Sequence, residues 1–264
     1  MKSPIRYYGG KGGMLKEIIK YFPDVLSYKI YLEAFGGGGS LLFGKEISPI
    51  EIYNDLEENV YSLFKTISNP DEFKKFKEKA DLCYFSRKIR DEFEKDLKSN
   101  KLDTFDRAFK YWYVNRTSYS GSGGFSVNTS VRRGISKSTS DLLATVENLP
   151  NIHNRLSTTV IENKNGILLV EKYSNEDTFM YLDPPYYPST RTPAKYKCDM
   201  TCDDHKNLID ILLKTKAKVL LSGYDNEQYE RLCIKGWERI DFNVNTITNK
   251  RVPKKKIESL WKNY

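Results

Sequence analysis

Hydrophobic residues fall into short apolar runs separated by amphipathic stretches, a pattern that predicts an α/β protein. Residues 30–35 form an apolar run, residues 50–53 are again typical of an extended strand, and four consecutive glycines stand between them at 36–39. Because residues 40–46 can coil, this section predicts a strand, a glycine turn, a short helix and a second strand. Further β-rich runs occur at 178–182, 218–222 and 237–242. They alternate with helix-like stretches such as 203–216, which favours a mostly parallel sheet.

Residues 69–155 have a different pattern, in which charge-rich helical stretches replace strands. Helices are predicted at 71–79, 87–98 and 104–114. The segment 118–140 is rich in Gly, Ser, Thr and Asn and predicts a loop or hairpin that projects from these helices. We therefore expect a discontinuous catalytic domain, residues 1–68 and 156–264, and an inserted helical subdomain, residues 69–155, with a hairpin near 118–135.

Composition and charge narrow the class of protein. The 264 residues include 43 Lys and Arg against 35 Asp and Glu, which gives a net charge of +8. The sequence pI is about 9.0 and the mean hydropathy is −0.60. This balance favours a polyanionic partner such as nucleic acid. No apolar run approaches the roughly 20 residues that cross a bilayer, and the first ten residues contain no apolar secretory core, so we expect an intracellular protein without membrane contact.

The four cysteines, at 83, 198, 202 and 233, have no disulfide-framework spacing and no Cys-x-x-Cys pair. Reduced thiols are expected. Cys198, Cys202 and His205 form a conceivable ligand set, but the chain contains only one other His. The sequence therefore predicts no metal site.

The strongest chemical signal is Asp183-Pro184-Pro185-Tyr186, directly after a predicted strand. Prolines have no N–H group, so this turn presents carbonyl acceptors at the carboxyl end of the sheet, where α/β proteins bind ligands. The Asp183 carboxylate and the Pro184 carbonyl can both accept hydrogen bonds from one planar amine, whose nitrogen lone pair then becomes available for attack. Tyr186 can stack on the ring that carries the amine. The plainer interpretation is a strand terminator with a buried turn.

The glycine run at 36–39 forms a second candidate site, preceded by Glu33 at the strand end. Glycines at a strand-to-helix turn let the backbone approach a ligand closely. A dinucleotide fingerprint is excluded because Leu41 and Leu42 stand where its third glycine belongs, and no Gly-Lys-Ser or Gly-Lys-Thr completes a P-loop. A nucleoside without a phosphate chain remains, with Asp55 placed to bind ribose hydroxyls. A tight turn without any ligand is the alternative.

A third block, residues 6–13, holds Tyr7, Tyr8 and Lys11 in a glycine-rich loop before a helix that begins near Met14. Alone it predicts only a flexible leader. Together, in this order, the three blocks resemble the Dam-type (D12 class) site-specific DNA adenine N6-methyltransferases over nearly the whole chain.

The resemblance implies a Rossmann-like methyltransferase sheet that uses S-adenosylmethionine, with an inserted helical target-recognition subdomain. By this resemblance the cofactor-binding positions are Tyr7, Lys11, Glu33, Phe35, Gly37, Gly39, Asp55 and Asp183, and the catalytic positions are Asp183, Pro184, Pro185 and Tyr186. The family usually has Trp where this chain has Tyr7. It also implies a cytoplasmic enzyme of a prokaryotic cell or a phage, in a restriction-modification setting.

The resemblance extends into the insert. Residues 107–116 look like the helix that precedes the family's DNA-reading hairpin, and Tyr119 stands where that hairpin carries an aromatic that enters the base stack. The family's usual Asn-Gly-Leu-x-Arg is replaced by residues 120–124, Ser-Gly-Ser-Gly-Gly, so the base-reading Arg is missing. Recognition of GATC is therefore not expected.

Charges and aromatics in the insert indicate how DNA would be held. Residues 105–137 contain six basic side chains, one acidic side chain and seven aromatics. Basic residues attract phosphates without sequence preference, and exposed aromatics can wedge the base stack. The aromatics at 105, 109, 112 and 113 have helical spacing and are expected in the core of the insert. The expected DNA-binding residues are Arg116, Tyr119, Phe125, Arg132 and Arg133.

A second cluster of basic residues lies near the end of the sequence. It has one acidic residue, Glu258, and six basic residues: Lys250, Arg251, Lys254, Lys255, Lys256 and Lys262. It is either a solvated face or a phosphate contact. Pro253 predicts a loop, followed by a final strand near 257–261.

The expected activity is transfer of a methyl group from S-adenosylmethionine to the N6 amine of an adenine that has rotated out of double-stranded DNA. Three alternatives stay open: N4-cytosine methylation by the same motif, a non-catalytic DNA-binding protein on the same fold, and an RNA or protein methyltransferase. A protein glutamine enzyme would carry Asn at position 183. The sequence does not distinguish a monomer from a weak dimer.

Overall fold

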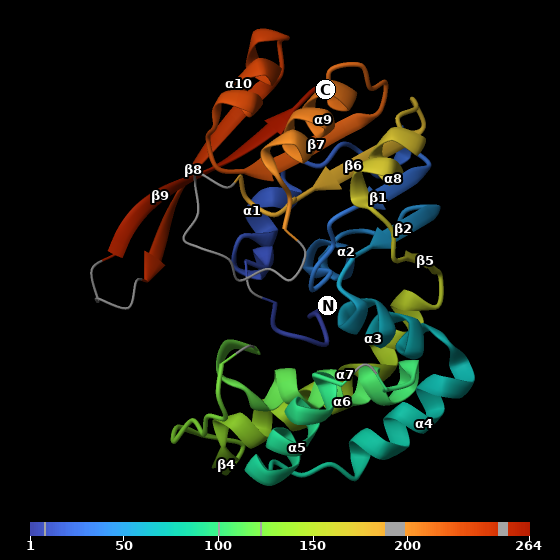
Figure 1. Cartoon of the computed structure of the whole chain (residues 1–264), viewed down its shortest axis with the longest axis vertical. Coiled ribbons are helices and arrows are strands. Elements are labelled where there is room, and N and C mark those ends of the chain that lie inside the picture. The colour runs from blue at the N-terminus through green and yellow to red at the C-terminus, as the bar shows by residue number, and fades with distance from the viewer. Residues whose placement is uncertain (8, 100, 122, 188–198, 248–252) are drawn as a thin grey trace. The chain divides into compact units, whose positions relative to one another are not determined.

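The structure is a computed structural model of the chain that describes all residues except 8, 100, 122, 188–198 and 248–252 (Figure 1). In the two strands beside the last gap, only the backbone is described for residues 243–247 and 253–256. Internal contacts divide the chain into two compact units. The first unit comprises Met1–Ile19, Gly37–Lys45 and Glu57–Asn163, and the second comprises Lys20–Gly36, Glu46–Leu56 and Lys164–Tyr264.

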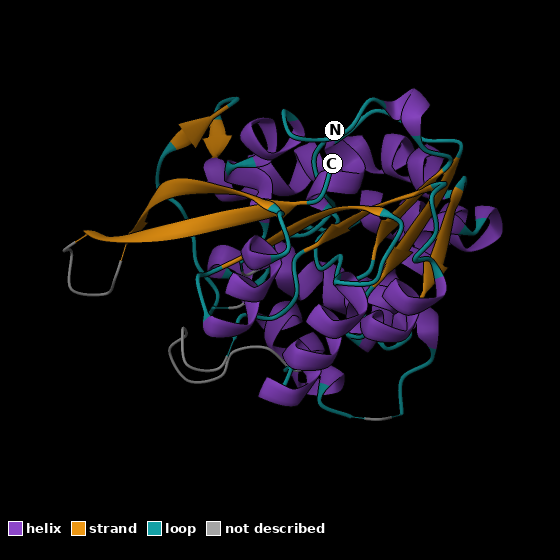
Figure 2. Cartoon of the chain, turned by 90° about the horizontal axis from the view of Figure 1, so that it is seen from above, coloured by secondary structure: helices purple, strands orange, loops and turns teal. Residues whose placement is uncertain are grey.

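The second unit is built on a mixed β-sheet whose strands follow the order β2-β1-β6-β7-β9-β8. Its strands are β1 (Ile30–Glu33), β2 (Ile50–Asn54), β6 (Thr178–Leu182), β7 (Lys218–Gly223), β8 (Glu238–Ile247) and β9 (Pro253–Lys262). Strands β2, β1, β6 and β7 are parallel, and β9 and β8 add an antiparallel edge. Figure 2 views the sheet close to edge-on, as one twisted layer. This arrangement confirms the predicted α/β class with a mostly parallel sheet.

Alternate residues of the parallel strands point to opposite faces of the sheet, and each face packs into a separate hydrophobic core. One set, which includes Leu32, Met180 and Leu221, packs against the helices α8 (Gly166–Lys172), α9 (Cys202–Leu212) and α10 (Glu227–Ile234). The other face is aromatic, because Phe22, Tyr28, Tyr31, Tyr181 and Tyr264 surround Phe179 or one another. Both faces of β6 are therefore buried, which explains why its sequence is apolar at every residue after Thr178.

The first unit is mainly helical. Its helices are α1 (Leu15–Ile19), α2 (Ser40–Gly44), α3 (Glu58–Ser68), α4 (Pro70–Asp81), α5 (Arg87–Leu97), α6 (Thr104–Thr117) and α7 (Lys137–Leu156), with 3-10 turns η1 (Lys11–Gly13) and η3 (Tyr119–Gly121). Strands β3 (Val131–Arg132) and β4 (Ile135–Ser136) form a hairpin, and β5 is Thr159–Glu162. The 3-10 turn η2 (Val25–Ser27) belongs to the second unit.

The core of the helical unit is aromatic. Phe76 of α4 contacts Phe105, Phe109 and Trp112 of α6 at ring-centroid distances of 5.3–6.4 Å, mostly edge to face. The ring of Phe93 of α5 also contacts the Phe109 ring, edge to face. The prediction that the evenly spaced aromatics of α6 are core residues is thus confirmed, although Phe105 is only half-buried.

Most predicted elements are found within a few residues of their expected ends, and three differences have local causes. Pro253 begins β9 instead of lying in a loop, since a strand tolerates proline at its first position. Residues 138–140 belong to α7, whose start is capped by the Ser136 hydroxyl accepting from the Thr139 N–H. Strand β8 continues beyond 242 to Ile247 because it pairs with β9 along its whole length.

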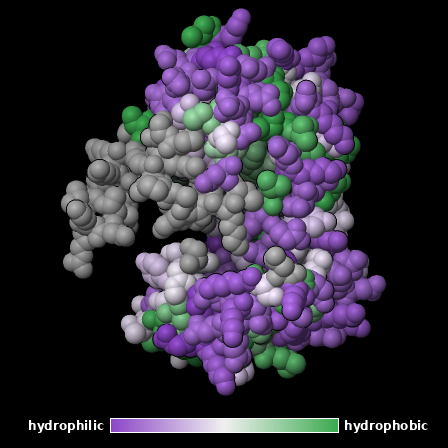
Figure 3. All heavy atoms as spheres, in the orientation of Figure 1, coloured by the Kyte–Doolittle hydropathy of each residue, from purple (hydrophilic) through white to green (hydrophobic). Residues whose placement is uncertain are grey.

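Hydrophilic residues dominate the coloured surface in Figure 3, and hydrophobic residues there form small separate patches. Among the described residues, none of the helices has the length and apolar content needed to cross a membrane.

Candidate active site

Acidic side chains collect at one edge of the sheet in the second unit. Glu33 ends β1 and is aligned with Tyr53 of β2 and Tyr181 of β6. Asp55 and Asp183 each stand two residues beyond those partners. Since β1, β2 and β6 are parallel, the three carboxylates lie at the same carboxyl edge, where open α/β sheets bind their ligands.

Two of these carboxylates are buried. Glu33 is 3% exposed and Asp55 is 8% exposed. The Tyr31 hydroxyl donates to Glu33 Oε2 at 3.0 Å, and burial together with the charge of Glu33 raises the pKa of Tyr31. Buried carboxylates need hydrogen-bond donors or cations around them, so this edge suits a ligand with hydroxyl groups or positive charge.

Asn54, which the sequence analysis did not single out, holds the loop that follows β1. Its Nδ2 donates to the carbonyls of Ala34 at 2.8 Å and Lys164 at 2.9 Å, and its Oδ1 accepts from the Lys164 N–H at 2.8 Å. The Gly36 N–H donates to the Asn54 carbonyl. A Cβ on Gly36 would collide with the Tyr53 ring, so the backbone here has room only for glycine. The sequence feature that could have identified Asn54 is its position, since it is a polar residue at the end of a predicted strand.

The Asp183-Pro184-Pro185-Tyr186 turn follows β6 directly. Pro184 is buried and Asp183 is half-buried. Burial, and then the charge of Asp183, raises the pKa of Tyr229 on α10. The Tyr229 hydroxyl lies 3.2 Å from His205 Nδ1, and its ring leaves no space for a Cβ on Gly223. The carboxylate thus lies among packed side chains at the end of the strand.

The ring of Tyr186 is fixed by residues that come much later in the chain. Its ring stacks on Tyr224 at a centroid distance of 4.2 Å, with 32° between the planes. Its hydroxyl donates to Oε1 of Glu258, at 3.3 Å, and the Ser222 hydroxyl donates to the same oxygen at 3.3 Å. Glu258 is 5% exposed and lies on β9. Glu258 and Tyr224 were not identified from the sequence, in which neither belongs to a recognisable motif.

Four further predicted cofactor residues belong to the first unit. Gly37 and Gly39 have φ of +50° and +66°, the left-handed region that favours glycine. A Cβ on Gly37 would lie 2.6 Å from Tyr7 Cε1, so the Tyr7 ring rests directly on the glycine backbone. Lys11, in η1, is buried. Phe35, the remaining predicted cofactor residue, lies in the second unit and packs against its core.

The predicted DNA-reading segment begins with η3. Tyr119 is 69% exposed, while its main chain is fixed by the Tyr119 N–H donating to the Gly124 carbonyl and the Gly123 N–H donating to the Tyr119 carbonyl. The β3–β4 hairpin turns at Arg133 and Gly134, with φ of +54° and +76°. Two positive φ values in a two-residue loop match the type I′ turn that suits a hairpin.

The predicted DNA-binding arginines are held by acidic or carbonyl partners. Arg132 pairs with Asp141 at 3.1 Å, and Arg133 pairs with Glu147 at 2.9 Å; both guanidinium groups are about half exposed. The Arg116 side chain donates to the Asp141 carbonyl at 3.2 Å, and burial lowers its pKa to about 10. Arg116 is thus the inward-facing member of this set.

Phe125, the last predicted DNA contact, packs within the unit. Its ring lies 5.0 Å from the Phe85 ring, and the Arg87 guanidinium stands 4.6 Å above it. Ser118 and Phe125 also form an isolated β-bridge. These contacts hold the loop of residues 119–124 closed at its base.

Several predicted positions lie outside the described residues, namely Tyr8, Cys198, Lys250 and Arg251. For Lys254, Lys255 and Lys256 only the backbone is described. Among the described side chains there is no group of three or more His, Cys, Asp or Glu residues that could hold a metal ion. The absence of a metal site stays a prediction.

Comparison with known proteins identifies the family. The sequence model of the D12 class N6 adenine-specific DNA methyltransferases matches residues 7–252. The chain belongs to this family. The match begins at Tyr7, includes the rest of all three sequence blocks, and ends before Glu258, the partner of Tyr186. The protein is therefore an adenine-specific DNA methyltransferase, which requires a methyl donor and DNA.

Characterised relatives of this methyltransferase are type II enzymes. It is 27% identical to the Type II methyltransferase M.MjaIII of Methanocaldococcus jannaschii, over 96% of this chain and 92% of the relative. It is 26% identical to the Type II methyltransferase M.CviBI of Paramecium bursaria Chlorella virus NC1A, over 88% and 90%. A third relative, M1.LlaDCHI of Lactococcus lactis subsp. cremoris, is 24% identical over 92% and 86%. Similar proteins thus occur in an archaeon, a virus and a bacterium.

Proposed function

We propose that this methyltransferase uses S-adenosylmethionine to methylate the N6 amine of an adenine rotated out of double-stranded DNA, as a site-specific enzyme of the type II kind. The observation that carries the proposal is the position of Asp183-Pro184-Pro185-Tyr186, at the carboxyl end of a fully buried central strand. The names of the relatives support the type II assignment.

The acidic edge fits this donor. S-adenosylmethionine, when bound, supplies an electrophilic methyl group on a positively charged sulfonium, and it carries ribose hydroxyls and an ammonium group. Glu33 and Asp55 are buried acceptors for such groups, and Asp183 adds a third carboxylate at the same edge. Gly36 lets the loop after β1 pass directly against the Tyr53 ring, which holds the main chain next to these strand ends. Phe35 would line this part of the site.

Residues of the first unit are assigned to the donor by the family's motif. We propose that Tyr7, Lys11, Gly37 and Gly39 complete the donor site. The Tyr7 ring lies against a glycine backbone that no larger residue could replace, which gives the pair a defined shape. The buried Lys11 would add a cation for the donor's carboxylate.

Catalysis would rest on orientation and on two hydrogen-bond acceptors. The Asp183 carboxylate and the Pro184 carbonyl would accept the two N–H groups of the amine, which localises the nitrogen lone pair for in-line attack. The amine nitrogen would form a bond to the methyl carbon while the donor leaves as a neutral thioether. The nitrogen would then carry the positive charge and would release one proton to the Asp183 carboxylate or to water. A carboxylate at this position stabilises the developing charge. Tyr186, held by Tyr224 and Glu258, would stack on the base.

DNA would be bound by the hairpin region of the first unit. Tyr119 is the exposed aromatic proposed to enter the base stack, and Arg132 and Arg133 are the half-exposed cations proposed to contact phosphates. Arg116 and Phe125 are engaged inside the unit, so we propose that they support this surface. The missing base-reading Arg indicates a target other than GATC.

The test is transfer of tritium from labelled S-adenosylmethionine to duplex DNA, RNA and protein, followed by mass spectrometry of the DNA nucleosides. We expect N6-methyladenine in duplex DNA only. N4-methylcytosine without N6-methyladenine, or labelled RNA or protein without labelled DNA, would refute the proposal. Asp177 provides a matched control for Asp183, because it is an exposed aspartate at the other end of the same strand, paired with Lys29. Asp177→Ala should methylate DNA normally.

A further inference from the structure

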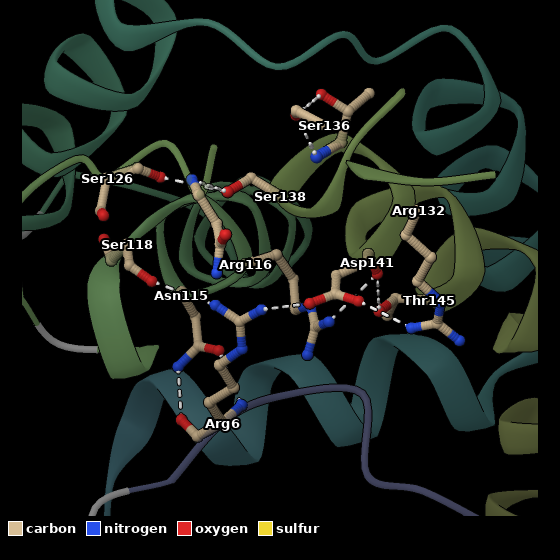
Figure 4. A network of polar contacts seen from close by, with 12 residues as sticks. Arg6, Asn115, Arg116, Ser118, Ser126, Arg132, Ser136, Ser138, Asp141 and Thr145 are labelled. Atoms are coloured by element: carbon tan, nitrogen blue, oxygen red, sulfur yellow. Dashed lines mark hydrogen bonds and ion pairs between the residues drawn. The ribbon is translucent and has the colours of Figure 1, made fainter. Parts of the chain in front are cut away.

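Asn115, a buried residue near the end of α6, binds the main chain of the N-terminal block in both directions. The Arg6 N–H donates to Asn115 Oδ1 at 2.8 Å, and Asn115 Nδ2 donates to the Arg6 carbonyl at 2.8 Å (Figure 4). This reciprocal pair joins residues 109 positions apart in the sequence. Arg6 thereby exchanges two main-chain hydrogen bonds with one amide, as a residue in an antiparallel β-ladder does with its partner, although it belongs to no strand.

The same amide also holds the DNA-reading segment. Asn115 Nδ2 donates to the Gly121 carbonyl at 3.2 Å, and Gly121 is the last residue of η3, which Tyr119 begins. Gly121 has φ of +85°, and a Cβ there would lie 2.5 Å from the Arg6 carbonyl oxygen. The Arg6 guanidinium donates to the Ser118 carbonyl at 3.2 Å. The segments around Arg6 and Tyr119 are therefore packed together on both sides of one amide.

Tyr7 follows Arg6 directly in the sequence and contacts the glycine loop, so it links Arg6 to that loop. The Tyr7 ring lies against Gly37, and its Cβ lies 2.9 Å from where a Cβ on Gly38 would stand. A displacement of Arg6 would move this ring, because a single peptide links the two residues. On the side of Gly37 and Gly38 the ring is already in close contact with the main chain, so it cannot move further in that direction.

From these contacts we infer that Asn115 is a positioning residue that couples binding of the methyl donor to binding of DNA. The inference rests on the proposed function, which places Tyr7 at the donor and Tyr119 at the DNA. DNA bound at Tyr119 would hold η3 in place. Because Asn115 bonds to both Gly121 of η3 and Arg6, the position of Arg6 would then be held as well. Arg6 in turn would hold the adjacent Tyr7 ring against the glycine loop. Each ligand then binds more tightly when the other is present, by the same factor in both directions.

The coupling factor is measured with S-adenosylhomocysteine, which cannot transfer a methyl group, and a duplex oligonucleotide that carries the enzyme's own target. The dissociation constant of S-adenosylhomocysteine is determined by calorimetry with and without the duplex. The dissociation constant of the duplex is determined with and without S-adenosylhomocysteine. For the wild-type protein we expect the two ratios to agree, at about 5-fold or more.

Three variants each disturb the contacts among Asn115, Arg6 and Gly121 in a different way. Asn115→Ala removes all three hydrogen bonds of the amide. Asn115→Asp keeps the acceptor for the Arg6 N–H but loses both donated bonds. Gly121→Ala places a methyl group against the Arg6 carbonyl. We expect all three variants to reduce the coupling factor to within about 2-fold of unity. Asn115→Asp belongs with the others because a carboxylate oxygen in place of Nδ2 faces the carbonyl oxygens of Arg6 and Gly121.

Asn148→Ala is the matched control, since the Asn148 side chain also donates to the N-terminal segment, at the Lys2 carbonyl, but over 3.4 Å on the surface. It should leave the coupling factor unchanged. A fold defect is detected by thermal unfolding, and if Asn115→Ala fails to fold, Asn115→Asp and Gly121→Ala decide the question.

Two results separate the inference from the proposed function. If the wild-type protein binds neither S-adenosylhomocysteine nor duplex DNA, the proposed function fails and the inference falls with it. If both ligands bind but the wild-type coupling factor is unity, or folded Asn115 and Gly121 variants retain it, the inference alone is overturned.

Discussion

The pair formed by Tyr186 and Glu258 yields the sharpest prediction, because Glu258 belongs to no motif and lies beyond the part of the chain that the family's sequence model matches. Replacing Glu258 by Ala removes the acceptor for two hydroxyl groups, those of Tyr186 and Ser222. The Ser222 hydroxyl is then left in a buried setting, and the Tyr186 hydroxyl in a partly buried one. Glu258→Gln keeps a carbonyl acceptor of nearly the same size.

The expected magnitude follows from the contacts. A hydrogen bond to a charged group contributes about 1.5–3 kcal/mol, and both bonds are long at 3.3 Å, so we take the lower end for each. Glu258→Ala should thus lower the free energy of unfolding by about 3 kcal/mol. Stacking of a base on an aromatic ring is worth about 1–3 kcal/mol. If the unanchored Tyr186 ring loses about 1–1.4 kcal/mol of this, the methylation rate falls about 5- to 10-fold.

The assay is single-turnover methylation of a duplex, with thermal unfolding of each variant measured in parallel. Glu238→Ala is the control, because Glu238 is an exposed glutamate on the neighbouring strand β8, paired with Lys262. Its free energy of unfolding should change by no more than about 0.5 kcal/mol. We expect Glu258→Gln to lie between Glu258→Ala and the wild type. A folded Glu258→Ala protein with the wild-type rate, alongside a slow Tyr186→Ala protein, would show that Glu258 does not position the ring.

Four further outcomes are expected. Asp183→Ala should abolish turnover and largely retain DNA binding in a gel-shift assay; retained methylation would remove Asp183 from the mechanism. Tyr119→Ala should weaken specific binding and slow base extrusion, read from 2-aminopurine fluorescence, whereas Tyr84→Ala, at another exposed tyrosine, should not. Arg132→Ala should weaken binding to all sequences alike and reduce the salt slope by about 1, and an unchanged slope would argue against a phosphate contact. Burial raises the pKa of Tyr113 from 10.0 to about 12, so the folded state keeps a proton that the unfolded state releases in this range, and stability should fall as pH rises through it. Urea unfolding at several alkaline pH values should show a shallower fall for Tyr113→Phe.

Local patterns in the sequence predicted the parallel core and the turn at its carboxyl edge. The run 178–182 is apolar at every residue after Thr178 because both faces of the strand are buried, and β6 has those bounds. The two prolines after it cannot continue a ladder, so the local sequence also predicted the turn at Asp183-Pro184-Pro185-Tyr186. The spacing of aromatics in α6 likewise indicated the core of the helical unit.

Only the tertiary structure identified the residues that hold these parts in place. Glu258 reaches Tyr186 across 72 positions of sequence, and Asn115 reaches Arg6 across 109. Burial of an apolar face repeats with the period of a helix or strand, and such a repeat can be recognised in one sequence. A hydrogen bond between one amide or carboxylate and a distant backbone or hydroxyl group produces no repeating pattern in the sequence, so it cannot be recognised there. The partners in such a bond are decided by how the packed elements bring distant segments together.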